Sequence, residues 1–124
     1  MKKILAFVLC MLFVVTLCGC GGIESVKENL SDAGYTVNDM DESRLSSLNN
    51  DVIYNYKGKG SVIGGFYATN KDGESVLGVE FSDKDDMTLM YKQLKSELEE
   101  GWIIDLKGKI VIYGTEKAVK TALK

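Results

Sequence analysis

The residue types that most often carry out chemistry are unevenly represented in this chain of 124 residues. It contains no histidine, and its three cysteines, Cys10, Cys18 and Cys20, all lie within the first twenty residues. Histidine is the side chain whose charge changes near neutral pH, and it is the commonest metal ligand. Its absence excludes Ser–His and Cys–His nucleophile pairs within the chain. We therefore expect no enzymatic activity, no cofactor and no metal site.

The first twenty residues have the order of a secretory signal peptide. Lys2 and Lys3 form a basic start, residues 4–17 are apolar apart from Thr16, and small residues follow. A transmembrane helix needs about 17–25 apolar residues. The shorter run favours a cleaved signal, and an uncleaved anchor is the alternative.

The end of this segment, Leu17-Cys18-Gly19-Cys20, resembles the lipobox of bacterial lipoproteins. The lipobox is an apolar residue, a small residue, Gly or Ala, and a cysteine that receives a diacylglyceryl group before cleavage. Cys18 departs from the pattern, because Ser, Ala or Thr is more usual there. The resemblance implies that residues 1–19 are a cleaved signal peptide and that Cys20 is the lipidated first residue. It also implies attachment to the extracytoplasmic face of the cell membrane.

Lipidation of Cys20 would leave the mature chain without a free thiol or a disulfide. Stable anchoring takes two or more acyl chains, which a diacylglyceryl group supplies. The mature chain would carry 13 basic and 18 acidic side chains, a net charge of −5. Residues 20–105 carry net −9 and residues 106–124 carry net +4. This acidic balance argues against nucleic acid as a partner.

Four polar segments could be read as ligand sites, and each has a simpler explanation. The acidic groups around Asp41 and Asp85 lack the glycine-bearing loop of a calcium site, so we expect helix capping and solvation. Glu97, Glu99 and Glu100 near a helix end could mark a partner surface or a cation contact, or be simply solvated. Residues 58–65 are glycine-rich but do not match a phosphate loop, so we expect a hairpin loop.

Aromatic residues recur on segments that we expect to be strands. Tyr54, Tyr56, Tyr67 and Trp102 are the residues we select as a possible ligand or partner surface. Aromatic side chains on an uncovered sheet face could bind glycan or peptide. They also favour strands for reasons of packing alone.

Hydrophobic periodicity and turn residues define the remaining elements. Helices are expected at about 24–33, from an Asp41 cap to about Leu48, at about 83–100 with Ser82 as the N-cap, and after Thr115. Strands are expected at 35–37, 52–57, 62–69, 75–81, 102–106 and 109–113, with a hairpin turn at 70–73. Residues 20–23 would be the lipidated cysteine and a short tether, and residues 24–124 a single domain.

Short turns between strands imply mostly antiparallel pairing. The expected fold class is therefore α+β, a two-layer sandwich with a mostly antiparallel sheet of about five strands and helices packed on one face. The short tether, about 10–14 Å long, would hold the domain against the bilayer. We expect the C-terminal lysines, Lys117, Lys120 and Lys124, to face anionic headgroups.

The sequence favours a non-enzymatic, membrane-anchored lipoprotein that binds a partner protein or an envelope component. The alternative is a domain that binds a small ligand such as a glycan, a peptide or a lipid. A hydrolase that uses paired carboxylates is a third possibility.

Overall fold

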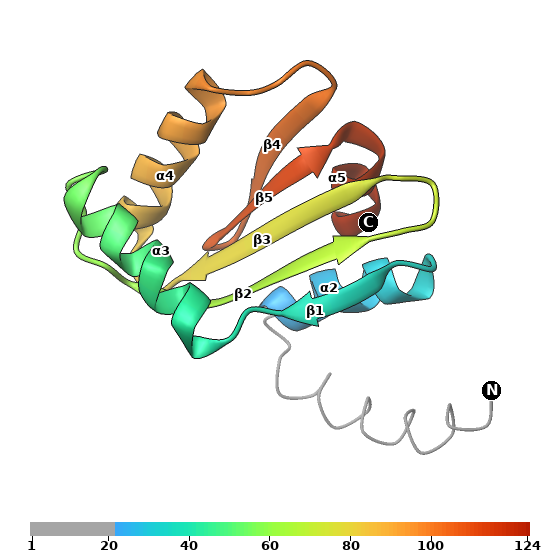
Figure 1. Ribbon diagram of the computed structural model, residues 1–124, viewed down its shortest axis with the longest axis horizontal. Helices are drawn as coiled ribbons and strands as arrows, with labels where there is room; N and C mark the ends of the chain where they lie inside the picture. The colour runs from blue at the N-terminus through green and yellow to red at the C-terminus, as the bar shows by residue number, and fades with distance from the viewer. Residues whose placement is uncertain (1–21) are drawn as a thin grey trace.

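The computed structural model describes residues 22–124 (Figure 1). The expected signal peptide, the expected lipidation site Cys20 and Gly21 lie outside the described residues. The elements follow in the order α2 (Gly22–Asp32), β1 (Thr36–Asp39), α3 (Glu42–Tyr54), β2 (Val62–Thr69), β3 (Ser75–Phe81), α4 (Lys84–Ser96), β4 (Trp102–Lys107), β5 (Ile110–Thr115) and α5 (Glu116–Ala122).

The five strands form one antiparallel sheet in the order β1-β2-β3-β5-β4. The predicted hairpin of β2 and β3 is confirmed at both strand boundaries. Its turn is held by the Asn70 side chain, whose Oδ1 accepts from the backbone N–H groups of Asp72 and Glu74. Gly73 supplies the positive φ of 86° that this turn needs. The α+β class and the antiparallel sheet are as expected.

One face of the sheet packs against α2 and α5, which lie behind the strands in Figure 1. Val26 and Leu30 of α2 and Val119 of α5 meet Phe66 and Ile112 of the sheet in a fully buried cluster. Residues of alternating strand positions contribute to it, as a pleated sheet requires.

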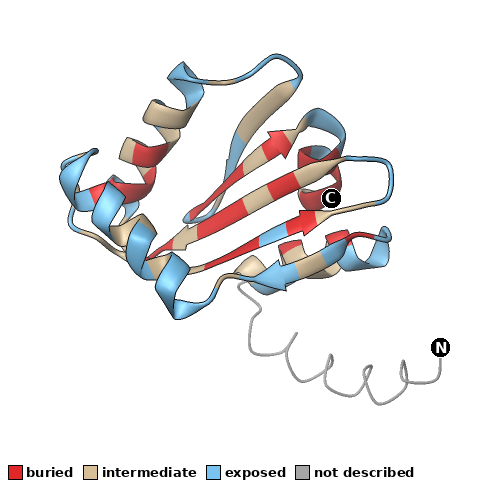
Figure 2. Ribbon diagram, viewed as in Figure 1, coloured by how far each residue is buried: buried red, intermediate tan, exposed pale blue. Residues whose placement is uncertain are grey.

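The opposite face packs against α3 and α4, which adds a third, partial layer to the two that we expected, so the helices lie on both faces of the sheet and not on one. Val52 of α3 and Met87 and Met90 of α4 cover Val79 and Val111. Ile110 and Ile112 belong to the first cluster and Val111, between them, to this one, so the two clusters lie on opposite faces. Figure 2 shows the resulting buried positions along β2, β3 and β5.

The strand predicted at 52–57 is wrong, because α3 continues through Tyr54. Leu45, Leu48 and Val52 recur at helical spacing and pack into the second cluster. The side chain of Asn49 also fixes the helix to β2, since it accepts from Val62 N at 2.7 Å and donates to Val62 O at 3.2 Å. Val52 thus belongs both to the alternation of residues 52–57 and to the helical spacing of Leu45 and Leu48, and packing favours the helix.

The helix ends differ from the predictions in three places. Asp41 caps α3 as expected and accepts from Arg44 N at 2.9 Å. Asp83, and not Ser82, is the N-cap of α4, and that helix ends at Ser96. Thr115 occupies the N-cap position of α5 without a capping bond, because its hydroxyl bonds to the Ser75 backbone instead.

The first helix begins two residues earlier than predicted, at Gly22. Ile23, which we assigned to the tether, packs against the first cluster. The tether between Cys20 and the folded domain is therefore shorter than expected.

Candidate functional site

The helices α3 and α4 cover the half of their sheet face that is farther from the β2–β3 turn and leave the nearer half only partly covered (Figure 1). At this half, Tyr67 of β2 is paired with Leu77 of β3, Leu77 with Tyr113 of β5, and Tyr113 with Ile104 of β4. Side chains opposite one another on paired strands share a face. Trp102 lies two residues before Ile104 on β4, so its side chain is on the same face of the sheet. We call Tyr67, Leu77, Tyr113, Ile104 and Trp102 the open half-sheet.

The aromatic side chains of the open half-sheet are only partly covered. Tyr67 is 46% exposed, and Leu77, Tyr113, Ile104 and Trp102 are half-buried. The rings of Trp102 and Tyr113 lie 5.0 Å apart between centroids at a tilt of 57°, which is a favourable aromatic pair. This pair is a fixed apolar surface, whereas Tyr67 is free to contact a ligand.

A row of hydroxyl side chains borders the aromatic row on the side of the β2–β3 turn. Thr69 is paired with Ser75, and the Thr115 hydroxyl donates to Ser75 O at 3.3 Å and accepts from Ser75 N at 3.2 Å. Thr115 is in turn paired with Trp102. The open half-sheet therefore offers apolar contact in one row and hydrogen-bonding groups in the next.

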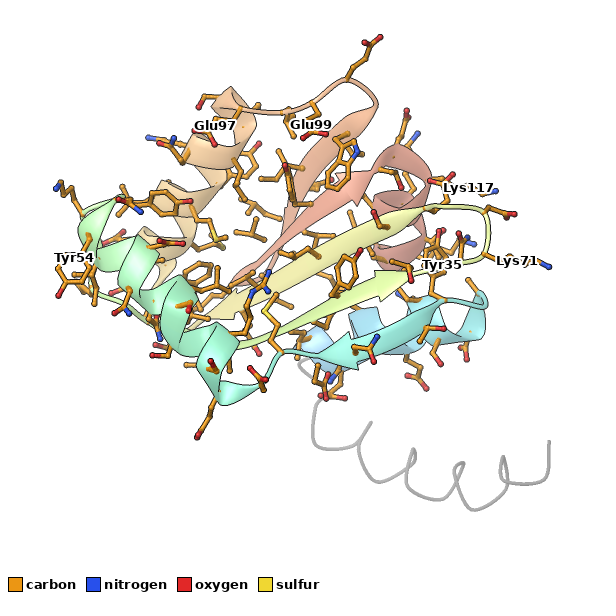
Figure 3. All side chains as sticks on the ribbon, in the orientation of Figure 1. Tyr35, Tyr54, Lys71, Glu97, Glu99 and Lys117 are labelled. Carbon is orange, nitrogen blue, oxygen red and sulfur yellow. The ribbon has the colours of Figure 1, made fainter. Side chains whose placement is uncertain are left out.

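Carboxylates of the α4–β4 connection lie beside the open half-sheet. Burial and the negative charges of Glu99 and Glu97 raise the pKa of the Tyr113 hydroxyl, which places both carboxylates near this ring. Figure 3 shows both glutamates on the connection above the sheet. Glu97 accepts from Gln93 at 2.6 Å, and neither glutamate forms a salt bridge within residues 22–124. This margin therefore carries uncompensated negative charge.

A groove of about 640 Å³ adjoins the same surface on the side of β1 and α3. Tyr67 and Leu77 form its floor, and Asp39, Asp41 and Arg44 lie among its walls. Asp41 Oδ1 is engaged in capping α3, and Asp39 forms a 2.7 Å ion pair with Lys27. Arg44 is the one cation that lines the groove.

The four aromatic residues selected from the sequence fall into two places. Tyr67 and Trp102 share the open half-sheet. Their proximity could not be predicted without the strand order. Tyr54 lies at the end of α3, where it is 69% exposed, and Tyr56 packs against the second cluster beyond it. Neither is on a strand, so these two residues do not join Tyr67 and Trp102. Tyr113 and Leu77 complete the surface and were not selected.

The glycine-rich segment at 58–61 binds an anion from within the protein. Asp86 Oδ1 accepts from Lys59 N at 2.8 Å, and Oδ2 accepts from Ser61 N at 2.9 Å and Ser61 Oγ at 2.7 Å. Burial, which opposes ionisation, is outweighed by these hydrogen bonds, so the pKa of Asp86 lies below its ordinary value. The donors that a phosphate would need are therefore occupied by a carboxylate.

Gly58 is required for the approach of this loop to Asp86. A Cβ at Gly58 would lie 2.6 Å from Asp86 Oδ1 and 2.7 Å from Val52 Cγ1. We expected Asp86 to be a solvated residue that favours the helix dipole, but it is 1% exposed and holds the 58–61 loop.

Within the described part of the chain, no group of three or more potential ligand side chains could hold a metal ion. Of the helices in residues 22–124, none is long and apolar enough to span a bilayer. Comparisons with protein-family models, with curated proteins and with solved structures find no match for this chain.

Proposed function

We propose that this protein is a lipid-anchored extracytoplasmic lipoprotein whose open half-sheet binds a cationic segment of a partner protein. The lipid anchor follows from the resemblance of Leu17-Cys18-Gly19-Cys20 to a lipobox. The observation that supports binding is the partly covered half of a sheet face, where Tyr67 is 46% exposed beside the Trp102–Tyr113 pair. Exposed aromatic residues of this kind are typical of interaction surfaces.

The charge around the open half-sheet favours a basic partner. Glu97 and Glu99 lie at one margin without a salt bridge among the described residues, and residues 20–124 carry net −5. Opposite charges at the margin of an interface accelerate association and exclude partners of the wrong sign. The rows of aromatic and hydroxyl side chains suit an extended peptide, which presents both apolar groups and backbone polar groups.

A small ligand is the second candidate, and the groove beside Tyr67 supports it. Its volume of about 640 Å³ is within the range of small-molecule sites. A glycan would stack on the aromatic rings and bond to Ser75 and Thr115. A cationic peptide is favoured because its basic side chains would pair with the carboxylates of the margin, which form no salt bridge among the described residues.

The tryptophan of the chain permits a direct test. Trp102 is the single tryptophan, so its fluorescence reports on the open half-sheet alone. We expect a lysine- and arginine-rich peptide to shift or quench its emission, and an acidic peptide of equal length to leave it unchanged. Tyr67→Ala should weaken the effect at least tenfold, which is a typical loss for an aromatic contact residue.

Tyr54→Ala is the matched control, because Tyr54 is also an exposed tyrosine but lies outside the open half-sheet. It should bind the basic peptide as the unmodified protein does. A response to neutral oligosaccharides and to no peptide would overturn the peptide proposal in favour of the small-ligand candidate. Equal losses for both tyrosine variants would show that the open half-sheet is not the binding surface.

A further inference from the structure

The start of the folded domain, at the beginning of α2, lies beside one end of the sheet and far from the other. A Cβ at Gly22 would lie 3.9 Å from Glu80 Oε2, and one at Gly64 would lie 3.7 Å from Glu80 Oε1. The start of α2 is therefore beside the end of β3 and the beginning of β2. On the far side of α2, Lys107 Nζ lies 3.4 Å from Ser25 Oγ. We call this part of the domain, which includes the turn between β4 and β5, the α2 end.

The C-terminal lysines lie at the other end of the sheet. Lys117 and Lys120 line a surface hollow with Glu74, which directly precedes β3. Glu74 and Glu80 are six residues apart on an extended segment, so they lie about 20 Å apart. Figure 3 shows Lys117 at the same end as Lys71 of the β2–β3 turn. The expected contact of Lys117 and Lys120 with the bilayer therefore does not fit the position of α2.

The α2 end carries both cationic and exposed apolar side chains. Lys107 and Lys109 flank the turn between β4 and β5. Their ammonium groups donate hydrogen bonds to Ser25 Oγ and Ser82 O, and neither lysine forms a salt bridge in the part of the chain that the structure describes. Ile63, which precedes Gly64 at the start of β2, is 57% exposed, and Leu106 is 36% exposed. Lysines attract anionic headgroups, and apolar side chains enter the interface beneath them.

The distance from the lipid attachment point to this end is short. Cys20 and Gly22 are two residues apart, so their Cα atoms are separated by at most about 7 Å. A diacylglyceryl group on Cys20 would thus hold the start of α2 at the level of the headgroups. The opposite end of the strands would then lie about 20 Å farther from the bilayer.

From this geometry we infer that the α2 end rests on an anionic phospholipid surface through Lys107, Lys109 and Ile63. The inference depends on the proposed lipidation of Cys20. The open half-sheet lies toward the other end of the strands, because Tyr67 and Trp102 flank the rows nearest the β2–β3 turn. It is therefore presented away from the membrane, where a partner protein reaches it.

The test places a fluorescent label at each end of the lipidated protein. Lys109→Cys and Lys71→Cys are matched variants, because both are exposed lysines in turns and the thiol of Cys20 is consumed by lipid. Each full-length variant is produced in a bacterial host, purified and reconstituted in vesicles of phosphatidylglycerol and phosphatidylcholine with brominated acyl chains. We expect the label at position 109 to be quenched severalfold more than the label at position 71.

Equal quenching at the two positions in protein that floats with the vesicles would overturn the orientation and leave the lipid anchor intact. Protein that does not float with the vesicles, and whose Cys20 carries no lipid by mass spectrometry, would overturn the anchor and the orientation together. We expect Lys107→Glu to reduce the quenching at position 109 and Lys117→Glu to leave it unchanged. This result would support a contact between Lys107 and the anionic headgroups.

Discussion

Asp86 offers the sharpest test of how this domain is held together. Its carboxylate is 1% exposed and accepts three hydrogen bonds from the 58–61 loop, at 2.7 to 2.9 Å. Asp86→Asn keeps the shape of the side chain but replaces one acceptor oxygen by a donor. At least one N–H or O–H of the loop would then face another donor, inside the protein.

The expected loss can be estimated from these contacts. A hydrogen bond to a charged group contributes about 1.5–3 kcal/mol, and a buried donor left without a partner costs about 1–3 kcal/mol. The two effects overlap, so we expect Asp86→Asn to lower the free energy of unfolding by about 2–4 kcal/mol. Equilibrium unfolding in urea measures this loss as a lower midpoint at an unchanged slope.

Asp85→Asn is the matched control, since Asp85 is exposed in the same first turn of α4. It removes the same charge from the positive end of the helix dipole, which is worth about 0.3–1 kcal/mol. Losses of equal size for the two variants would refute the reasoning, because the dipole alone would then explain the effect of Asp86.

The same contacts predict a dependence on pH. The pKa of Asp86 is lower in the folded protein than the ordinary value of about 3.9 in an unfolded chain. The unfolded state therefore binds the proton more readily, and the contribution of Asp86 is complete above about pH 5. It should disappear as the pH falls through the folded pKa, so the difference between the unmodified protein and Asp86→Asn should shrink below about pH 4.

Two further substitutions test the packing of the first cluster. A Cβ at Gly78 would overlap the ring of Phe66, so Gly78→Ala should destabilise the domain by about 1–3 kcal/mol, and Phe66→Leu should recover part of that loss in the double variant. The buried Tyr35 hydroxyl lies beside the Thr121 side chain but forms no hydrogen bond of good geometry among residues 22–124, so Tyr35→Phe should leave the free energy of unfolding unchanged or raise it by up to about 1 kcal/mol. A decrease of more than about 1 kcal/mol in the free energy of unfolding, measured by thermal unfolding, would show that the hydroxyl forms a hydrogen bond.

Much of the fold could be predicted from local patterns. The β2–β3 hairpin was predicted to the residue, because alternation in both strands and a turn of Asn70 to Gly73 agree with each other. The segment around Val52 was mispredicted because local periodicity allowed both a strand and a helix. Tertiary packing of Leu48 and Val52 decided between them, and that information is not local.

The candidate site was predicted in part for a related reason. Tyr67 and Trp102 were selected as aromatic strand residues, but they share a face because β5 inserts between β3 and β4. That order rests on the long-range pairing of β3 with β5, which no local signal in the sequence indicates. Asp86 was missed because its partners, in the 58–61 loop, lie about 25 residues away in sequence.

The most direct test of the central claim is photo-crosslinking in living cells from the open half-sheet. A photoreactive phenylalanine analogue at position 67 samples this surface, and the same analogue at position 54 samples a more exposed site elsewhere. The account predicts one discrete protein adduct from position 67, lost when Glu97 and Glu99 are both changed to lysine, and no such adduct from position 54. Identical adducts from both positions, or none from position 67 in membrane-bound protein, would contradict it.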